Sequence, residues 1–416
     1  MGLTTLTPMS AAAEKPVHYL DHAATTPVLP AVVDELSRLL RVPGNAGSVH
    51  GSGRRARRLV EESRERLAAA LGARPGDVVF TGGGTEADNL AVKGLYWARQ
   101  GRPRRRVLVS EVEHHAVLDA AGWLGAQQGA VVEHLPVDSD GVMRLDAVRA
   151  ALDADPDGVA VLSCMWVNNE VGTVQPLDAV VELAHSRCVP VHTDAVQALG
   201  QVPVDLGSLG ADAVSITGHK IGGPVGVGAL IVGPDHERAP RPVALLHGGG
   251  QERGMRSGTA DVAGIGALAL AVERAVERQR EQAVRLRGLG RSLLELVHAA
   301  VPDVVLNGPA VDGPESMRSP AIWHLTFPGC DGDALLMLLD AGGVECSTGS
   351  ACSAGVPQAS HVLLAMGRDE TAAAGSLRIS LGHSSTPADV EAFAAAIGPV
   401  VMRARAAGTT PVRKAG

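Results

Sequence analysis

The stretch Val78-Val79-Phe80-Thr81-Gly82-Gly83-Gly84-Thr85-Glu86-Ala87-Asp88-Asn89 contains an apolar run, a turn of three glycines and the start of a helical pattern. The apolar run predicts a strand over 78–80, and the pattern after the glycines predicts a helix over 85–100. The same succession of apolar run and helical pattern recurs along the following sequence. This alternation predicts an α/β fold with a parallel, doubly wound sheet and helices on both of its faces.

The other predicted elements of this sheet follow the same rules. The further strands are expected at 107–110, 131–134, 158–164, 189–193, 213–217 and 228–232. The further helices are expected at 53–71, 115–128 and 177–187. These strands are mostly apolar in composition, which is typical of strands that are buried on both faces.

A second pattern begins after Thr259. A helix is expected over 260–300, followed by strands at 321–326 and 377–380 and helices at 332–341 and 386–406. We therefore predict two folded units between two tails. The expected divisions are a tail at 1–15, a large domain at 16–262, a smaller α/β domain at 263–405 and a tail at 406–416.

Length and composition exclude several classes of protein. The chain has 416 residues, of which 45% are hydrophobic and 20% charged, so it can bury a sizeable core. The net charge of −8 and the aromatic content of 2% argue against a nucleic-acid binder. Five cysteines in so long a chain do not suggest a secreted disulfide framework, and neither a secretory signal nor a membrane-spanning segment is seen. We expect a cytoplasmic protein.

The glycine turn at 82–84 has the form of a phosphate cradle. Glycines let backbone N–H groups approach an anion, the start of a helix adds partial positive charge, and Thr85 offers a hydroxyl. The stretch matches neither the Walker loop nor Gly-x-Gly-x-x-Gly. An ordinary glycine-rich turn is the alternative, and this stretch alone does not decide between them.

Lysine is rare here, with four among the 37 basic residues. Lys15 and Lys414 lie in the tails and Lys93 lies within a predicted helix, whereas Lys220 directly follows the strand at 213–217. Ligands of open α/β sheets bind at the carboxyl ends of strands. Burial there lowers the pKa of an amine and makes it nucleophilic, so Lys220 is the candidate for a Schiff base; a surface ion pair is the alternative.

Two more side chains follow predicted strands. Asp194 ends the strand at 189–193 and needs a cationic partner, such as a protonated pyridine nitrogen, or else it caps the next turn. His114 lies beyond the strand at 107–110, where an imidazole could stack on a flat cofactor and move protons, or simply face solvent. A metal site formed by His114 and His115 is disfavoured because adjacent side chains do not converge on one ion.

The segment Glu345-Cys346-Ser347-Thr348-Gly349-Ser350-Ala351-Cys352-Ser353-Ala354-Gly355 places two thiols among small residues. We expect an exposed, flexible loop at 346–356 that lets a thiolate reach a partner. The spacing does not suggest zinc. Cys164 and Cys188 are expected to be inert, buried thiols.

In this order, the motifs resemble the NifS/IscS-type cysteine desulfurases, which are pyridoxal 5'-phosphate (PLP) enzymes of the class V aminotransferase superfamily. The matching segments are Tyr19-Leu20-Asp21-His22-Ala23-Ala24-Thr25-Thr26-Pro27, Ser48-Val49-His50, residues 81–89, Asn168-Asn169-Glu170-Val171-Gly172-Thr173, residues 215–220, His247-Gly248-Gly249-Gly250-Gln251-Glu252-Arg253, Arg256-Ser257-Gly258-Thr259, Gly349-Ser350-Ala351-Cys352 and Leu377-Arg378-Ile379-Ser380-Leu381-Gly382. They span almost the whole chain. The resemblance implies the fold of type I PLP-dependent transferases, with a mainly parallel seven-stranded sheet in the large domain.

The resemblance also implies a role for each matching residue. The cofactor-binding set would be Gly84, Thr85, His114, Asn169, Asp194, Gln197, Thr217, His219, Lys220 and, from the neighbouring subunit of a homodimer, Thr259. The catalytic set would be Cys352, Lys220 and His114. The substrate-binding set would be Asn45, Asn169 and Arg378. Gly84 and Thr217 depart mildly from the family pattern, where alanine and serine are common.

The implied reaction releases L-alanine from L-cysteine and leaves a persulfide on Cys352. The sulfur would pass to an acceptor, by default an iron–sulfur scaffold protein. No resident metal is expected; Cys352 as a shared iron–sulfur ligand is an option that we do not adopt. A direct nucleic-acid or membrane partner is not expected. The alternatives are a selenocysteine lyase, another class V aminotransferase, and a PLP-free redox or binding protein that uses Cys346 and Cys352.

Overall fold

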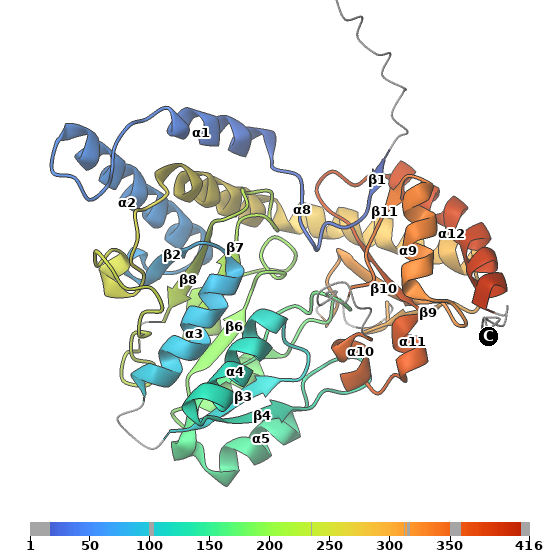
Figure 1. Ribbon diagram of the computed structural model, residues 1–416, viewed down its shortest axis with the longest axis horizontal. Coiled ribbons are helices and arrows are strands. Elements are labelled where there is room, and N and C mark those ends of the chain that lie inside the picture. The colour runs from blue at the N-terminus through green and yellow to red at the C-terminus, as the bar shows by residue number, and fades with distance from the viewer. Residues whose placement is uncertain are drawn as a thin grey trace, which may run out of the picture.

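The computed structural model describes residues 17–99, 104–233, 235–311, 313, 317–349 and 359–408 (Figure 1). Its largest sheet has seven strands. They are β2 (Val78–Thr81), β3 (Arg106–Ser110), β4 (Val131–Leu135), β5 (Val159–Ser163), β6 (Val191–Asp194), β7 (Ala213–Thr217) and β8 (Gly228–Val232). The order across the sheet is β2-β8-β7-β6-β5-β3-β4. The neighbours from β7 to β4 pair in parallel, and β8 runs against both β2 and β7.

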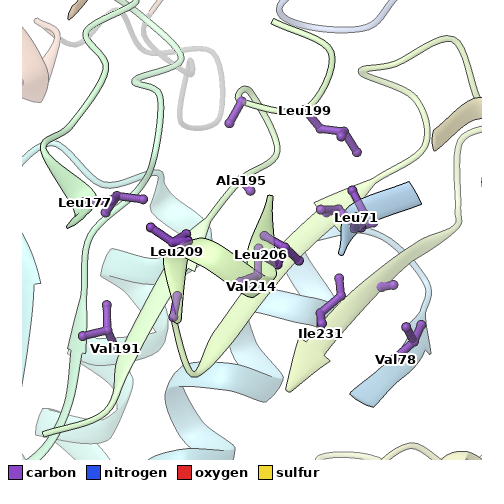
Figure 2. Packing of buried hydrophobic residues seen from close by; sticks show 14 of the residues in the cluster. Leu71, Val78, Leu177, Val191, Ala195, Leu199, Leu206, Leu209, Val214 and Ile231 are labelled. Atoms are coloured by element: carbon purple, nitrogen blue, oxygen red, sulfur yellow. The ribbon is translucent and has the colours of Figure 1, made fainter. Parts of the chain in front are cut away.

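Helices cover both faces of this sheet, as the strand composition requires. On one face α3 (Gly84–Ala98) and α4 (His115–Gln128) share an apolar cluster with alternate strand residues such as Leu230 and Val232. On the other face α2 (Gly51–Leu71), α5 (Leu145–Ala154) and α6 (Leu177–His185) close over residues such as Val214 and Ile231. Figure 2 shows part of this second cluster, with Leu71 and Val78 beside Ile231.

Smaller elements form a second group around its own apolar cluster, which includes Trp323, Phe327 and Phe393. Strands β9 (Val305–Asn307), β10 (Ile322–Thr326) and β12 (Ser376–Ser380) form an antiparallel sheet in the order β12-β10-β9. Strand β1 (His18–Tyr19) pairs in parallel with β11 (Val344–Glu345). The helices of this group are α9 (Gly332–Ala341), α10 (His361–Ala365), α11 (Glu370–Ala374) and α12 (Pro387–Gly408).

The 39-residue helix α8 (Val262–Ala300) runs between the two groups in Figure 1. It contacts α2 and α1 (Pro30–Leu40) on one side and α12 on the other. Its side chains divide accordingly, since Leu268 and Val272 belong to the cluster under the large sheet and Leu286 and Leu293 belong to the cluster of the second group. The division into domains at residue 262 stays a prediction.

The remaining elements are short. They are α7 (Leu206–Leu209) and three 3₁₀ helices at Pro75–Asp77, Pro156–Gly158 and Glu252–Gly254. Within the described ranges, no helix combines the length and the apolar character that a membrane crossing requires.

The structure confirms the expected fold class. All seven strands of the main sheet lie within three residues of their predicted bounds, and α4 and α9 match theirs in full. The doubly wound sheet is not parallel throughout, because β8 forms a hairpin-like antiparallel pair with β7. The sequence did not indicate α1, α5, β1, β9 or β11. Strands of two or three residues carry too little pattern to be recognised, and their partners far along the chain define them.

Candidate active site

A cavity opens beside the carboxyl ends of β2, β3, β5, β6 and β7, and β12 supplies one wall from the second group. It spans about 1160 Å³, including its open mouth. Its lining residues include Ala23, Ala24, Gly84, Thr85, Asp88, His114, His115, Met165, Asn169, Glu170, Asp194, Val196, Gln197, Thr217, His219, Lys220, Ser347, Gly349, His361 and Arg378. Ten of the residues that the sequence selected therefore meet in one place.

Lys220 follows β7 and points its amine into this cavity wall. The Nζ atom donates hydrogen bonds to the backbone oxygens of Ala23 (2.5 Å) and Ala24 (2.7 Å). Burial and then the positive charge of Arg378 lower the pKa of the amine to about 8, against smaller opposing effects of Asp21 and Asp194. About a tenth of Lys220 is thus uncharged at pH 7, far more than for an ordinary lysine, and the uncharged amine is the nucleophilic and proton-abstracting form.

Asp194 ends β6 and is 5% exposed. Its Oδ1 accepts a hydrogen bond from the backbone N–H of Val196 at 2.8 Å, so it caps the following turn as well as facing the cavity. Burial, and next the negative charge of Asp88, raise the pKa of the carboxyl to about 8. A cationic group bound against Asp194 would favour its ionised form.

His114 precedes α4 and serves as its N-cap. Its Nδ1 accepts a hydrogen bond from the N–H of Ala116 at 3.1 Å, which leaves Nε2 as the protonated nitrogen on the neutral ring. Enclosure by the surrounding protein, and then the charge of Lys220, lower the pKa of His114 to about 4. The ring is therefore neutral at pH 7 and can face a flat, electron-poor group.

The glycine turn contributes to the cavity wall through Gly84. Gly83 has φ +140° and ψ −179°, a conformation that only glycine adopts readily, and α3 begins at the next residue. A Cβ on Gly84 would lie 3.0 Å from Val196 Cγ2 and 3.6 Å from Thr217 Cβ, so a side chain there would narrow the space. Thr85 and His219 also line the cavity. The start of the 15-residue helix α3, with hydroxyls and an imidazole around it, suits a phosphate.

Arg378 enters from β12 and is 5% exposed. Its two terminal nitrogens donate to the backbone oxygen of Asn169 and to Asp21 Oδ1, both at 2.8 Å. Its Nε has no hydrogen-bond partner among the described residues. The guanidinium therefore retains capacity for a further anion, such as a carboxylate.

Asn169 and Gln197 complete the cavity wall near Lys220. Asn169 lies beside the buried Asn168, whose side chain instead holds the local turn through the N–H groups of Glu170 and Val171. Gln197 donates from Nε2 to the same Ala23 oxygen that Lys220 contacts, at 2.8 Å. These contacts fix the amine and the amide side by side.

Two predicted site residues lie outside the cavity, and a third lies outside the described residues. Asn45 is exposed and accepts a hydrogen bond from the N–H of Gly47, away from the cavity. Thr259 is exposed and lines a separate depression with Arg256 and Asp261. Cys352 lies outside the described residues, although Ser347 and Gly349, earlier in its segment, line the cavity. The roles of all three stay predictions.

The other cysteines separate by environment. Cys164 is fully buried next to β5, and burial raises its pKa well above the ordinary value. Burial, and next Asp21, raise the pKa of Cys346 to about 12. The expectation that Cys188 is buried was wrong: it is exposed, with φ +56° after α6, because the chain turns sharply there before β6.

Sequence reasoning missed several residues of the cavity. Asp88 on α3 is 1% exposed yet lines it, and so do His115 and His361, which meet edge to face with ring centroids 5.0 Å apart. Asp88 lies within the quoted glycine segment, and a buried charge at a helix position facing the sheet was the available signal. His361 comes from a distant segment and left no signal.

Comparison with known proteins identifies the family. The family model described as "Aminotransferase class-V" matches residues 18–393. The chain is 54% identical over 391 residues to the IscS-like cysteine desulfurase of Mycobacterium tuberculosis, covering 94% of this chain and 97% of that protein. The chain belongs to the class V aminotransferases, as a cysteine desulfurase.

Further relatives agree with this membership. Cysteine desulfurase IscS of Clostridium botulinum, strain Kyoto, is 38% identical over 374 residues, covering 90% of this chain and 91% of that protein. A solved NifS-like protein matches with a TM-score of 0.83 at 33% identity, over 93% of this chain and all of that one. A structure of SspA in complex with cysteine matches with a TM-score of 0.72 at 31% identity, over 88% of this chain and 98% of that one.

Proposed function

We propose that this desulfurase uses PLP to remove the sulfur of L-cysteine and holds it as a persulfide on Cys352. The observation that carries the proposal is the meeting of Lys220, Asp194 and Arg378 in one cavity. An amine, a buried acid and a guanidinium with an unpartnered nitrogen are the groups that a pyridine aldehyde and an amino acid require.

The described residues fit the proposed cofactor. Lys220 would hold it covalently, Asp194 would face its ring nitrogen, and His114 would stack on the ring. Gly84, Thr85, Thr217 and His219 would hold its phosphate, with Asn169 and Gln197 near the ring oxygen. When bound, PLP supplies an electron-withdrawing ring that stabilises negative charge on the substrate.

Three side chains of this protein would have different roles toward the substrate. Arg378, in the cavity wall, would bind the carboxylate of L-cysteine bidentately. The amine of Lys220, with its pKa near 8, would take the Cα proton and later return a proton to the three-carbon product. His114 is neutral at pH 7 and would move the thiol proton of the substrate.

The sulfur step balances without an added oxidant. The Cys352 thiolate forms an S–S bond to the substrate sulfur while the Cβ–S bond breaks. The electron pair of the broken bond stays with the three-carbon fragment, which takes up protons and leaves as L-alanine. One thiol and L-cysteine thus give one persulfide and L-alanine.

We further propose a homodimer in which Thr259 reaches the neighbouring subunit's phosphate site. The support is its position: Thr259 is exposed and lies outside the cavity of its own chain. Asn45, also exposed, would assist substrate binding. The acceptor of the sulfur would be an iron–sulfur scaffold protein in the cytoplasm.

The experiment compares Cys352→Ala with Cys188→Ala, which removes an exposed thiol outside the cavity. The PLP-loaded proteins receive L-cysteine and a reducing thiol, and sulfide and L-alanine are measured. We expect Cys352→Ala to lose both products by about 10³-fold and Cys188→Ala to keep them. Full activity in Cys352→Ala would contradict the assignment, and L-selenocysteine as a parallel substrate reports on the selenocysteine lyase alternative.

A further inference from the structure

A carboxylate lies in the first turn of α3, beside the place where the proposed phosphate would bind. Glu86 is the third residue of this helix. A carboxylate at that position commonly accepts from the N–H groups at the helix start and would then compete with an anion. Here Glu86 Oε2 accepts instead from the N–H of Gly82 at 2.8 Å, one residue before the N-cap Gly83. The N-cap has no side chain, so the first N–H groups of α3 are left for an external acceptor.

Arg256 engages the other oxygen of this carboxylate. Its Nε donates to Glu86 Oε1 at 2.8 Å, and its Nη2 lies 3.3 Å from Oε2. Among the described residues that line the active-site cavity are Gly84 and Thr85, which directly precede Glu86, but neither Glu86 nor Arg256. Both oxygens of Glu86 are therefore occupied outside the cavity, and the side chain does not take the place of a phosphate.

Close packing fixes the glycine turn around this contact. A Cβ on Gly82 would lie 2.7 Å from Glu86 Oε2, so only glycine lets the carboxylate approach its N–H. Thr81 Oγ1 donates to the backbone oxygen of Gly83 at 3.0 Å. A Cβ on Gly228 of β8 would lie 2.8 Å from the carbonyl carbon of Gly83, so that strand also packs directly against the turn. These contacts hold Gly83 at φ +140° and thereby set where α3 begins.

The charge of Glu86 would oppose phosphate binding if it had no cationic partner. A phosphate monoester carries about −1.5 to −2 charges at pH 7, and a carboxylate one residue after Thr85 would repel it. Glu86 can hold the turn without this repulsion only when a cation balances its charge. Arg256 supplies that cation through two contacts and leaves the positive end of α3 to the phosphate.

We propose that Glu86 and Arg256 are positioning residues for the phosphate of the cofactor: Glu86 sets the glycine turn through the N–H of Gly82, and Arg256 balances the charge of Glu86. This inference rests on the proposed function in taking PLP as the ligand whose phosphate lies at the start of α3. Both residues act through the turn rather than by touching the ligand. A pair that only stabilised the fold would affect all ligands of the cavity alike, whereas this pair discriminates by phosphate.

The test compares PLP with pyridoxal, which has the same ring and aldehyde but no phosphate. Full-length proteins freed of cofactor are titrated with each probe, and the Kd is read from the absorbance of the bound aldehyde. Arg256→Gln should weaken PLP binding about tenfold and leave pyridoxal within about twofold. Arg66→Gln is the control, since it removes a partly exposed arginine paired with Glu273 at 2.5 Å, and it should change neither Kd.

Variants of Glu86 separate its contact from its charge. Glu86→Gln keeps an oxygen for the N–H of Gly82 and removes the charge, so PLP binding should stay within about threefold of wild type. Glu86→Leu also removes the oxygen and should weaken PLP binding about tenfold, although it removes a negative charge. The double variant Glu86→Gln/Arg256→Gln has no unbalanced carboxylate and should regain most of the affinity that Arg256→Gln loses.

Equal losses for PLP and pyridoxal in Arg256→Gln would overturn the inference, because the pair would then serve the fold alone. A double variant as weak as Arg256→Gln would also overturn it and would show that Arg256 acts in another way, for example on Thr259 in the same depression. If Arg256→Gln does not fold, Glu86→Leu against Glu86→Gln decides. If the wild type takes up no PLP, the proposed function fails instead, and the ³¹P line width of inorganic phosphate, broadened by wild type and less by Arg256→Gln, then decides the inference.

Discussion

The buried charges behind the cavity and those beneath the loop at 247–259 differ in how they are paired. Behind the cavity, Asp88, Glu113 and Asp194 share no lysine or arginine at contact distance within the described residues. Beneath the loop, Arg64 donates from both terminal nitrogens to Glu252 at 2.8 Å, and Glu252 also accepts from the N–H of Phe80 at 2.9 Å.

The difference distinguishes charges that hold the fold together from charges that are available to a ligand. Paired charges satisfy one another and hold a backbone in place, here one with left-handed φ at Glu252 (+46°) and Arg253 (+57°). Unpaired buried acids cost stability in the empty protein and are useful only if a ligand supplies the missing charge. The cavity is therefore the part of the molecule in which a bound cationic group would supply the missing positive charge.

The largest expected effect is a loss of activity in a variant that keeps its fold. Lys220→Ala should reduce sulfide release from L-cysteine by at least about 10³-fold, because the covalent and proton-moving amine is lost. Its far-UV circular dichroism and unfolding midpoint should stay close to wild type, since the variant removes a partly buried cation. Lys93→Ala, on α3 over the Trp123 ring, is the matched control and should keep activity.

A second variant removes one charge of the buried ion pair beneath the loop and should lower stability. Glu252→Gln removes the charge opposite Arg64, whose side chain is only 4% exposed, and should lower the free energy of unfolding by about 3 kcal/mol in chemical denaturation. Glu61→Gln is the control because it removes the other, half-exposed partner of Arg64, at 3.2 Å. A change of less than about 1 kcal/mol is expected for it. Equal effects of the two variants would show that the buried partner of Arg64 stabilises the protein no more than the half-exposed one.

A pH series tests the cost of the unpaired acids. In protein without PLP, unfolded Asp194 ionises near pH 4, whereas folded Asp194 ionises near pH 8. Its contribution to stability is therefore present below pH 4 and is lost as the pH rises toward 8. Asp194→Asn lacks this loss, so its melting temperature minus that of wild type should rise by several degrees between pH 5 and pH 8. A difference that stays constant with pH would show that Asp194 is not buried as an acid.

The smallest expected effect concerns a partly exposed ion pair near the same loop. Arg256 pairs with Glu86 at 2.8 Å, but both side chains are about one quarter exposed. Water screens this pair, so Arg256→Gln should cost no more than about 1 kcal/mol, measured in the same denaturation series as Glu252→Gln. A loss as large as that of Glu252→Gln would show that burial does not set the strength of these pairs.

The same contrast explains what the sequence could reveal. Strand and helix patterns encode the main sheet, because most strands are rich in apolar residues and the apolar residues of each helix return to the same face. The residues at strand ends, Asp194 and Lys220, could be found because charge directly after an apolar strand is informative. Glu113 and His192 could not, because a single polar residue after or within a strand does not reveal which others it meets.

Arg378 shows the same limit for the second group. Its match to the family motif indicated a role, but its contacts with Asp21 and Asn169 join segments separated by 357 and 209 residues. Such contacts arise only when β12 packs against the cavity edge. Likewise the exposed Cys188 was mistaken for a buried thiol because its position before an apolar strand suggested the core.

The claim on which the account depends is that the amine of Lys220 holds a pyridine aldehyde inside the cavity. The purified protein should be loaded with PLP, reduced with borohydride, digested and mapped by mass spectrometry. We predict that the peptide containing Lys220 gains the mass of one reduced pyridoxyl phosphate group and that Lys220→Ala shows no modified peptide. The added mass on Lys93 or on the N-terminal amine alone, with Lys220 unmodified, would contradict the account.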